Sequence, residues 1–130
     1  MAMETAMTSG ICVSVRTRYR PEYSDPIKKS YLFSYIISIE NRSDYVVKLL
    51  RRHWYIFDSC GTHREVEGEG VVGLQPTLQP GETHEYESAC NLTTEMGRMH
   101  GTYTMERQVD GGVFKVAIPA FEMFAPFVMN

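Results

Sequence analysis

The sequence predicts an all-β protein, an antiparallel β-sandwich of about seven strands in the immunoglobulin-like or fibronectin-III-like class. Apolar and polar side chains alternate with a period of two along most of the chain, and a helical period is hard to find. The alternating runs are short and rich in β-branched and aromatic residues. Turn residues separate them at intervals typical of a sandwich.

Seven alternating runs are each predicted to form a strand. In the first of them, Ile11, Val13 and Val15 alternate with residues assigned to the opposite face. In the third, we assign Leu50, Trp54 and Ile56 to one face, directed at the core. The predicted strands cover residues 11–19, 31–39, 46–58, 64–68, 84–90, 99–107 and 113–118.

Turn chemistry marks the ends of these strands. Residues 110–112 (Asp-Gly-Gly) join two alternating runs and give the strongest hairpin signal in the chain. Residues 80–81 (Pro-Gly) suit a type II turn, because proline presets φ and glycine tolerates a positive φ. Residues 41–44 and 59–61 have the polar or glycine content of hairpin turns, and residues 23–26 form a loop.

The length of 130 residues and the 43% hydrophobic content predict one domain with one core. We expect the sandwich to span residues 11–124, with a loose tail at 1–10 and an apolar tail at 125–130. No apolar run reaches the length of a membrane span, and residues 1–10 lack the pattern of a signal peptide. Three cysteines without paired spacing favour a reduced, cytoplasmic protein.

The charge balance argues against nucleic acid as a partner. Thirteen basic and sixteen acidic residues give a net charge of −3, whereas phosphate backbones attract dense positive charge. The most basic cluster, Arg51, Arg52 and His53, adjoins Trp54 and has the composition of a stacking surface for single strands. Alternation favours another arrangement, with Trp54 in the core and its basic neighbours outside. We therefore expect neither a nucleic-acid nor a membrane partner.

Sequence blocks spread over about residues 11–124 resemble, in order, those of the ApaG domain family. Taken together they are far more specific than any one of them alone. The blocks are R-Y-R-P-E-Y-S-D-P (18–26), I-E-N (39–41), L-L-x-R-H-W (49–54), V-E-G-E-G-V-V-G-L-Q-P (66–76), L-x-P-G-E (78–82), Y-x-S (86–88), G-x-M-x-G-x-Y (97–103) and I-P-x-F (118–121).

This resemblance implies a fibronectin-III-like or immunoglobulin-like sandwich, the fold that the strand pattern predicts independently. The family occurs as a small bacterial protein and as a domain of eukaryotic F-box and polymerase-interacting proteins, which implies an interaction module. Bacterial members have been linked to cobalt and magnesium resistance. The family has no settled biochemical activity.

The sharpest short motif is G-E-G-V-V-G, in which Gly68, Gly70 and Gly73 have G-x-G-x-x-G spacing. A dinucleotide-binding fold needs a helix after this motif, but two prolines follow closely and prevent one. The loop could still hold an anion through backbone N–H groups, although three flanking glutamates repel phosphate. The competing interpretation is a tight turn that requires glycine for its backbone conformation.

The remaining candidates for chemistry are weak. Cys60 and His63 have half the spacing pattern of a zinc site, so we expect no metal and no cofactor. Glu85 and Glu87 share one face of a strand, which is typical of a solvated surface. A G-x-S-x-G nucleophile motif is absent from the sequence. We therefore predict no catalytic residues and no enzymatic activity.

The C-terminal end is unusually apolar. Phe124, Phe127 and Met129 follow the last predicted strand and lie near Pro126, so we expect them to be partly exposed. Exposed aromatic and methionine side chains are typical of interfaces. We predict that this tail contacts a partner or a second copy of the chain.

The resulting hypothesis is a non-enzymatic protein-interaction module of ApaG type, with an unknown protein partner. Its specificity would lie in sheet edges or end loops, with residues 68–73 as the first local candidate. The alternative is a site for a small anion, nucleotide or pyrophosphate at the loop of Gly68, Gly70 and Gly73.

Overall fold

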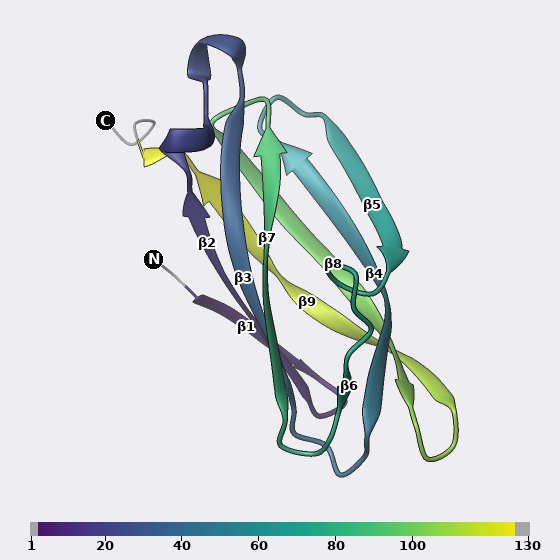
Figure 1. Cartoon of the computed structure of the whole chain (residues 1–130). Coiled ribbons are helices and arrows are strands. Elements are labelled where there is room, and N and C mark those ends of the chain that lie inside the picture. The colour runs from purple at the N-terminus through teal and green to yellow at the C-terminus, as the bar shows by residue number, and fades with distance from the viewer. Residues whose placement is uncertain (1–2, 127–130) are drawn as a thin grey trace.

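The computed structural model describes residues 3–126, which form a sandwich of two antiparallel β-sheets (Figure 1). Sheet I has the strand order β1-β2-β3-β7, and sheet II has the order β5-β4-β8-β9 with β6 beside β4. The predicted all-β sandwich class is confirmed. The strands of the described residues are β1 (Met3–Thr8), β2 (Ile11–Tyr19), β3 (Tyr31–Asn41), β4 (Val47–Asp58), β5 (His63–Glu69), β6 (Thr77–Leu78), β7 (Thr83–Leu92), β8 (Met96–Arg107) and β9 (Gly112–Phe124).

The core lies between the sheets and is built from alternate residues of both. Its centre is aromatic: the ring of Trp54 in sheet II lies 5.5 Å from that of Tyr35 in sheet I. The ring of Phe121 packs edge-on against Trp54 at 6.0 Å. Tilted and edge-on contacts of this kind add to the free energy gained by burial alone. The assignment of Trp54 to the core is confirmed.

The N-terminal segment differs from the expected loose tail. Residues 3–8 form β1, which pairs antiparallel with β2 from Met3 opposite Arg16 to Thr8 opposite Ile11. The connecting residues Ser9 and Gly10 both have positive φ, the geometry of a tight hairpin turn. Because β1 is held by backbone pairing and buries little side chain, hydrophobic alternation gave no sign of it.

A β-bulge in β4 places one leucine differently from the prediction. The pairing with β8 shifts between Leu49 and Arg51, so one extra residue enters β4 there. Leu49 is fully buried while Leu50 is half-buried, although Leu50 shares the parity of Trp54. The prediction that Leu50 faces the core was therefore wrong, because the bulge reverses the alternation between the two halves of β4.

The end of the sandwich lies one residue beyond the predicted boundary. β9 continues to Phe124, and the next residue, Ala125, is fully buried. The backbone N–H of Ala125 donates to the carbonyl of Glu95 at 2.8 Å. Ala125 therefore belongs to the sandwich and not to a separate tail.

The two sides of the sandwich differ (Figure 1). On one side, β1 and β2 lie against β9, and the N–H of Ala117 donates to the hydroxyl of Thr8 at 3.2 Å. On the other side, the edge strands β5 and β7 are not paired with each other. Among the described residues, no helix has the length and apolar composition needed to cross a bilayer.

Candidate functional site

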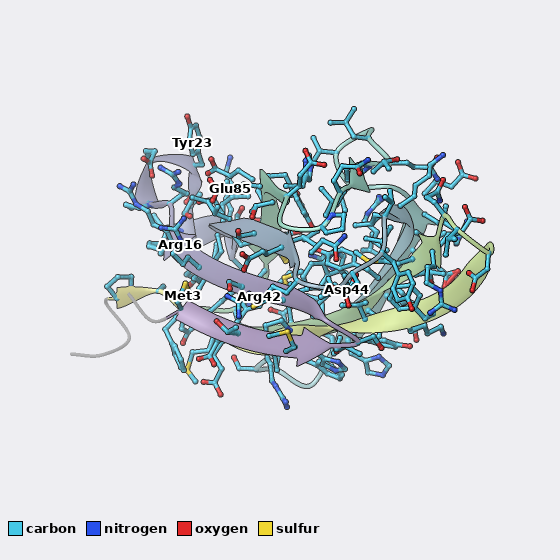
Figure 2. All side chains as sticks on the ribbon, turned by 90° about the horizontal axis from the view of Figure 1, so that it is seen from below. Met3, Arg16, Tyr23, Arg42, Asp44 and Glu85 are labelled. Carbon is cyan, nitrogen blue, oxygen red and sulfur yellow. The ribbon has the colours of Figure 1, made fainter. Side chains whose placement is uncertain are left out.

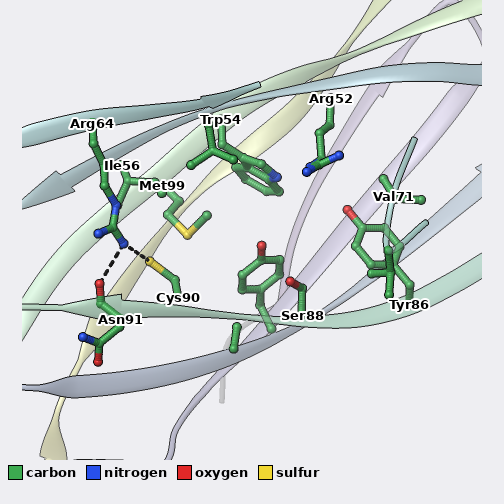
Figure 3. Close-up of a pocket in the computed structure, with 14 residues that line it drawn as sticks. Arg52, Trp54, Ile56, Arg64, Val71, Tyr86, Ser88, Cys90, Asn91 and Met99 are labelled. Carbon is green, nitrogen blue, oxygen red and sulfur yellow. Dashed lines mark hydrogen bonds between the residues drawn. The ribbon is translucent and has the colours of Figure 1, made fainter. Parts of the chain in front are cut away.

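A groove of about 350 Å³ lies on the open side, between β4 and β5 of sheet II and β7 of sheet I (Figure 3). Its walls carry two arginines, several aromatic rings, three hydroxyls and a thiol, and no carboxylate side chain. The lining residues are Tyr35, Arg52, Trp54, Ile56, Arg64, Val66, Val71, Val72, Tyr86, Ser88, Ala89, Cys90, Asn91 and Met99. A positively charged, partly apolar groove of this size can accept a side chain or a small molecule.

Arg52 reaches the groove by crossing β5. It lies opposite Gly68 in the β4–β5 ladder, and its Nη1 donates to the carbonyls of Glu69 and Gly70, each at 3.0 Å. An ideal β-carbon at residue 68 would lie 3.1 Å from Nη1, so Gly68 leaves the space in which the guanidinium lies. The positive charge is thus held at the open edge of sheet II.

The basic cluster predicted from the sequence is divided between the two faces of β4. Arg51 and His53 face outward, and His53 contacts the carboxylates of Glu65 and Glu67 at 3.0 Å through its two ring nitrogens. Arg52 shares the parity of Trp54 and lies on the inner face. The expectation that all basic neighbours of Trp54 point outward was therefore wrong for Arg52.

Arg64 lies near the other end of β5. Its Nη2 donates to the carbonyl of Asn91 at 2.7 Å and to Cys90 Sγ at 3.4 Å, as the dashed lines in Figure 3 show. Asn91 and Cys90 belong to β7, so this side chain bridges the two sheets across the groove. Arg64 was not among the candidates from the sequence. The available signal was its alternation with Glu65 and Glu67, which places the arginine on the opposite face of the strand from the two glutamates.

The opposite wall carries Tyr35 and Tyr86 of sheet I, and behind it Tyr86 contacts the fully buried Tyr103 of β8. The hydroxyls of Tyr86 and Tyr103 are hydrogen-bonded to each other. Burial raises the pKa of both groups, and the nearby positive charge of Arg52 opposes that rise. Burial likewise raises the pKa of Tyr35, with a hydrogen bond from Ser88 acting in the opposite direction. The hydroxyl groups of Tyr35, Tyr86 and Ser88 line this wall of the groove.

Next to the groove, the exposed edge of β5 presents free backbone groups. In the antiparallel ladder, Gly70 donates to the carbonyl of Leu50 and Asp58 donates to that of Thr62. The even-numbered residues of β5 therefore bond to β4, because hydrogen-bonded pairs alternate along such a ladder. The N–H and C=O groups of His63, Glu65 and Glu67 consequently point away from β4 and into solvent.

Comparison with known proteins places this architecture in a family. The family model described as the ApaG domain matches residues 21–107, from η1 (Pro21–Tyr23) to the end of β8. This chain belongs to the ApaG family. Protein ApaG of Anaeromyxobacter dehalogenans is 46% identical over 128 residues, which is 98% of this chain and 100% of that protein.

Other ApaG relatives agree with this assignment. Protein ApaG of Sinorhizobium fredii is 47% identical over 124 residues, 95% of this chain and 95% of the relative. The crystal structure of the putative ApaA protein of Bordetella pertussis has a TM-score of 0.86 and 44% identity, covering 89% of this chain and 94% of that one. The ApaG resemblance predicted from the sequence is confirmed.

The glycine motif of this ApaG chain forms the end of β5 and the hairpin turn after it. Val72 and Gly73 have positive φ, and Val71 and Leu74 exchange two backbone hydrogen bonds across them. A β-carbon at Gly70 would lie 2.3 Å from the carbonyl oxygen of Leu74. The N–H groups of Gly70, Val71 and Leu74 are all used inside the fold, which favours the tight-turn interpretation over an anion cradle.

The predicted C-terminal contact falls partly outside the described residues. Phe124 is 41% exposed and lines a second cavity of about 580 Å³ with Tyr19, Phe33 and Phe121. Phe127 and Met129 lie outside the described residues, so their contact with a partner stays a prediction.

The remaining sequence candidates lie on the surface. Cys60 is exposed in the β4–β5 turn, where hydrogen bonds from Thr62 lower the pKa of its thiol. Among residues 3–126, no group of three histidine, cysteine or acidic side chains is arranged to hold a metal ion. Glu85 lies on the outer face of sheet I, 3.8 Å from Arg16 (Figure 2), and Glu87 pairs with Arg20 at 3.2 Å.

Proposed function

We propose that this ApaG chain is a non-catalytic protein-interaction module that binds an extended segment of a partner protein along β5. The supporting observation is the solvent-facing edge of β5, where His63, Glu65 and Glu67 present backbone donors and acceptors at every second residue. Addition of a strand to such an edge gives affinity through main-chain hydrogen bonds, and neighbouring side chains give specificity.

The sheet edges on the closed side are less available to a partner strand than those on the open side. On the closed side, β1 and β9 lie against one another. On the open side, each edge has one carbonyl that already accepts a hydrogen bond from an arginine, that of Asn91 on β7 and that of Glu69 on β5. The edge of β5 is free from His63 to Glu67, which is long enough to pair with a short segment.

The charges on β5 disfavour pairing with a second copy of itself. In an antiparallel pairing of two β5 strands around Glu65, the Glu65 side chains of the two copies would lie opposite each other, and like charges in that position are destabilising. Charged edges also suppress indiscriminate aggregation. A different protein, and not another copy of this chain, is therefore the partner that we propose.

The alternative of an anion or nucleotide site in the glycine loop has less support. Three of the N–H groups of that loop are bonded within the fold, and the carbonyls of Glu69 and Gly70 face the guanidinium of Arg52.

The experiment is a selection of extended peptides from a displayed random library against the whole chain, followed by hydrogen-exchange measurement. We expect selected peptides to slow exchange of the Glu65 and Glu67 amides, because these N–H groups become bonded. Glu67→Pro removes one free backbone donor and should abolish peptide binding. The variant should still fold, because proline is tolerated at a solvent-facing edge position. Protection confined to another edge, or to the loops, would overturn the proposal.

Glu67→Ala is the matched control. It removes the same contacts with Arg51 and His53 but keeps the backbone N–H. It should bind the selected peptides within a few-fold of the unchanged chain. Equal binding by the proline and alanine variants would contradict strand addition at β5.

A further inference from the structure

The inner face of β5 offers three positions to any strand that pairs with it. Alternation places Arg64, Val66 and Gly68 on that face, above the groove. Because Gly68 has no side chain, the guanidinium of Arg52 lies in its place. Along the inner face the order is therefore positive, apolar, positive, with about 13 Å between the two ends at the usual rise of a strand.

Both arginines retain hydrogen-bonding capacity toward the groove. Among the described residues, the hydrogen bonds of Arg52 use Nη1 alone and those of Arg64 use Nη2 alone. Neither side chain forms an ion pair with a described carboxylate, whereas Arg51 on the outer face does. The fork of a guanidinium group matches a carboxylate, and such pairs are among the strongest hydrogen bonds in proteins.

Resting on the proposed strand addition at β5, we propose that the groove selects a segment with acidic side chains at positions i and i+4 and an apolar side chain at i+2. On a paired strand, inward side chains recur at every second residue and lie directly opposite those of β5. The first acidic group then meets Arg64, the apolar group meets Val66, and the second acidic group meets Arg52 at Gly68. Because this acidic–apolar–acidic pattern is symmetric, a segment satisfies it in either chain direction.

The environment of the groove strengthens this charge selection. The fourteen lining residues include no aspartate or glutamate, so no internal carboxylate competes for the arginines. The glutamates of β5 lie on its opposite face, where Arg51 and His53 hold two of them. A lysine at either acidic position would bring like charges together, which suppresses binding of wrong partners.

The test uses three threonine-rich nonapeptides that differ at two positions. The first has glutamate at i and i+4 with valine at i+2, the second has glutamine in place of both glutamates, and the third has lysine there. Calorimetric titration of the whole chain should give on the order of tenfold weaker binding for the glutamine peptide. The lysine peptide should not bind measurably, and added salt should weaken only the glutamate peptide.

Matched variants separate this inference from the proposed function. Arg64→Gln should reduce the preference for the glutamate peptide over the glutamine peptide, while Arg51→Gln on the outer face should leave that preference unchanged. Equal affinities of the glutamate and glutamine peptides, with the Glu65 and Glu67 amides still protected, would overturn the acidic pattern and leave strand addition intact. Binding of the glutamate peptide without protection of those amides would overturn both, and so would failure of every peptide to bind.

Discussion

The guanidinium of Arg52 occupies the space that a side chain at Gly68 would fill. The two residues lie opposite each other in the β4–β5 ladder, and the arginine uses this space to reach the carbonyls of Glu69 and Gly70. A glycine in the interior of a strand usually costs stability. Here it leaves a passage through which a charge on β4 reaches the edge of the sheet.

Gly68→Ala should displace Arg52 with only a small loss of stability. The added β-carbon would approach the end of a flexible side chain at 3.1 Å, so the guanidinium can move away. We expect a loss of about 0.5–1 kcal/mol in the free energy of unfolding, since strand propensity offsets part of the lost hydrogen bonding. Urea unfolding measures the loss, and the Arg52 side-chain NMR signals should shift. Unchanged Arg52 signals would contradict the prediction.

Gly101→Ala should be far more damaging, because its β-carbon would meet backbone. The position lies 2.1 Å from the carbonyl oxygen of His53, which cannot move without breaking the β4–β8 ladder. Overpacking of this kind costs about 3 kcal/mol. The control is Gly111→Ala, where the β-carbon meets nothing within 4 Å and only the positive φ is strained. Urea midpoints that fall equally in the two variants would argue against the contact.

The hydroxyls of Tyr86 and Tyr103 should be energetically coupled. Removing one hydroxyl leaves the other buried without its partner, so Tyr86→Phe and Tyr103→Phe should each lose about 1–3 kcal/mol. The double variant should lose clearly less than the sum, because neither orphaned group remains. A double-mutant cycle by urea unfolding gives the coupling energy. Additive losses would show that the pair does not act as a unit.

Stability should fall in alkaline solution. Burial raises the pKa of Tyr86, Tyr103 and Cys90, so these groups lose their protons in the unfolded chain at lower pH than in the folded one. Above about pH 9 the unfolded state then binds fewer protons, and the free energy of unfolding declines as pH rises. Below about pH 9 these groups are protonated in both states, so their contribution to the free energy of unfolding is fully present. Urea unfolding at stepped pH should show the decline, and the double Tyr→Phe variant should show a shallower one.

Asn41 should be the most sensitive buried polar residue. It is fully buried, its amide donates to the carbonyls of Tyr45 and Leu78, and its oxygen accepts from Ser43. Asn41→Ala leaves these partners without their hydrogen bonds and should lower the free energy of unfolding by about 2–4 kcal/mol. The exposed Asn91→Ala is the control and should change stability by less than about 1 kcal/mol. Thermal unfolding of the two variants compares them directly.

Local pattern was sufficient to predict most of the fold. Alternation located β2, β3, β4, β5, β7, β8 and β9 but not the two-residue β6, which is too short to alternate, and the Asp110–Gly112 turn joins β8 and β9 as expected. It failed where burial gave no signal, in the exposed β1, and where a bulge reversed the alternation, at Leu50. Both failures have one physical origin, because backbone pairing leaves little trace in the hydrophobic pattern.

The groove could be predicted only in part. The parity shared by Arg52 and Trp54 was visible in the sequence, and it contradicts a single outward cluster. Arg64 lies across from Cys90 because β5 and β7 are the edge strands on the open side. That strand order results from pairing between segments far apart in the chain, which local pattern does not reveal. The glycine motif was recognised, but its partner across the sheet was not.

The placement of the ends of the sandwich has a consequence for larger polypeptides. In Figure 1, β1 begins and β9 ends on the left of the molecule, whereas β5 lies on the right. A neighbouring domain joined before β1 or after β9 would therefore leave β5 uncovered. The same sandwich can thus be fused into a longer architecture at either end without obstructing the edge on which we place recognition.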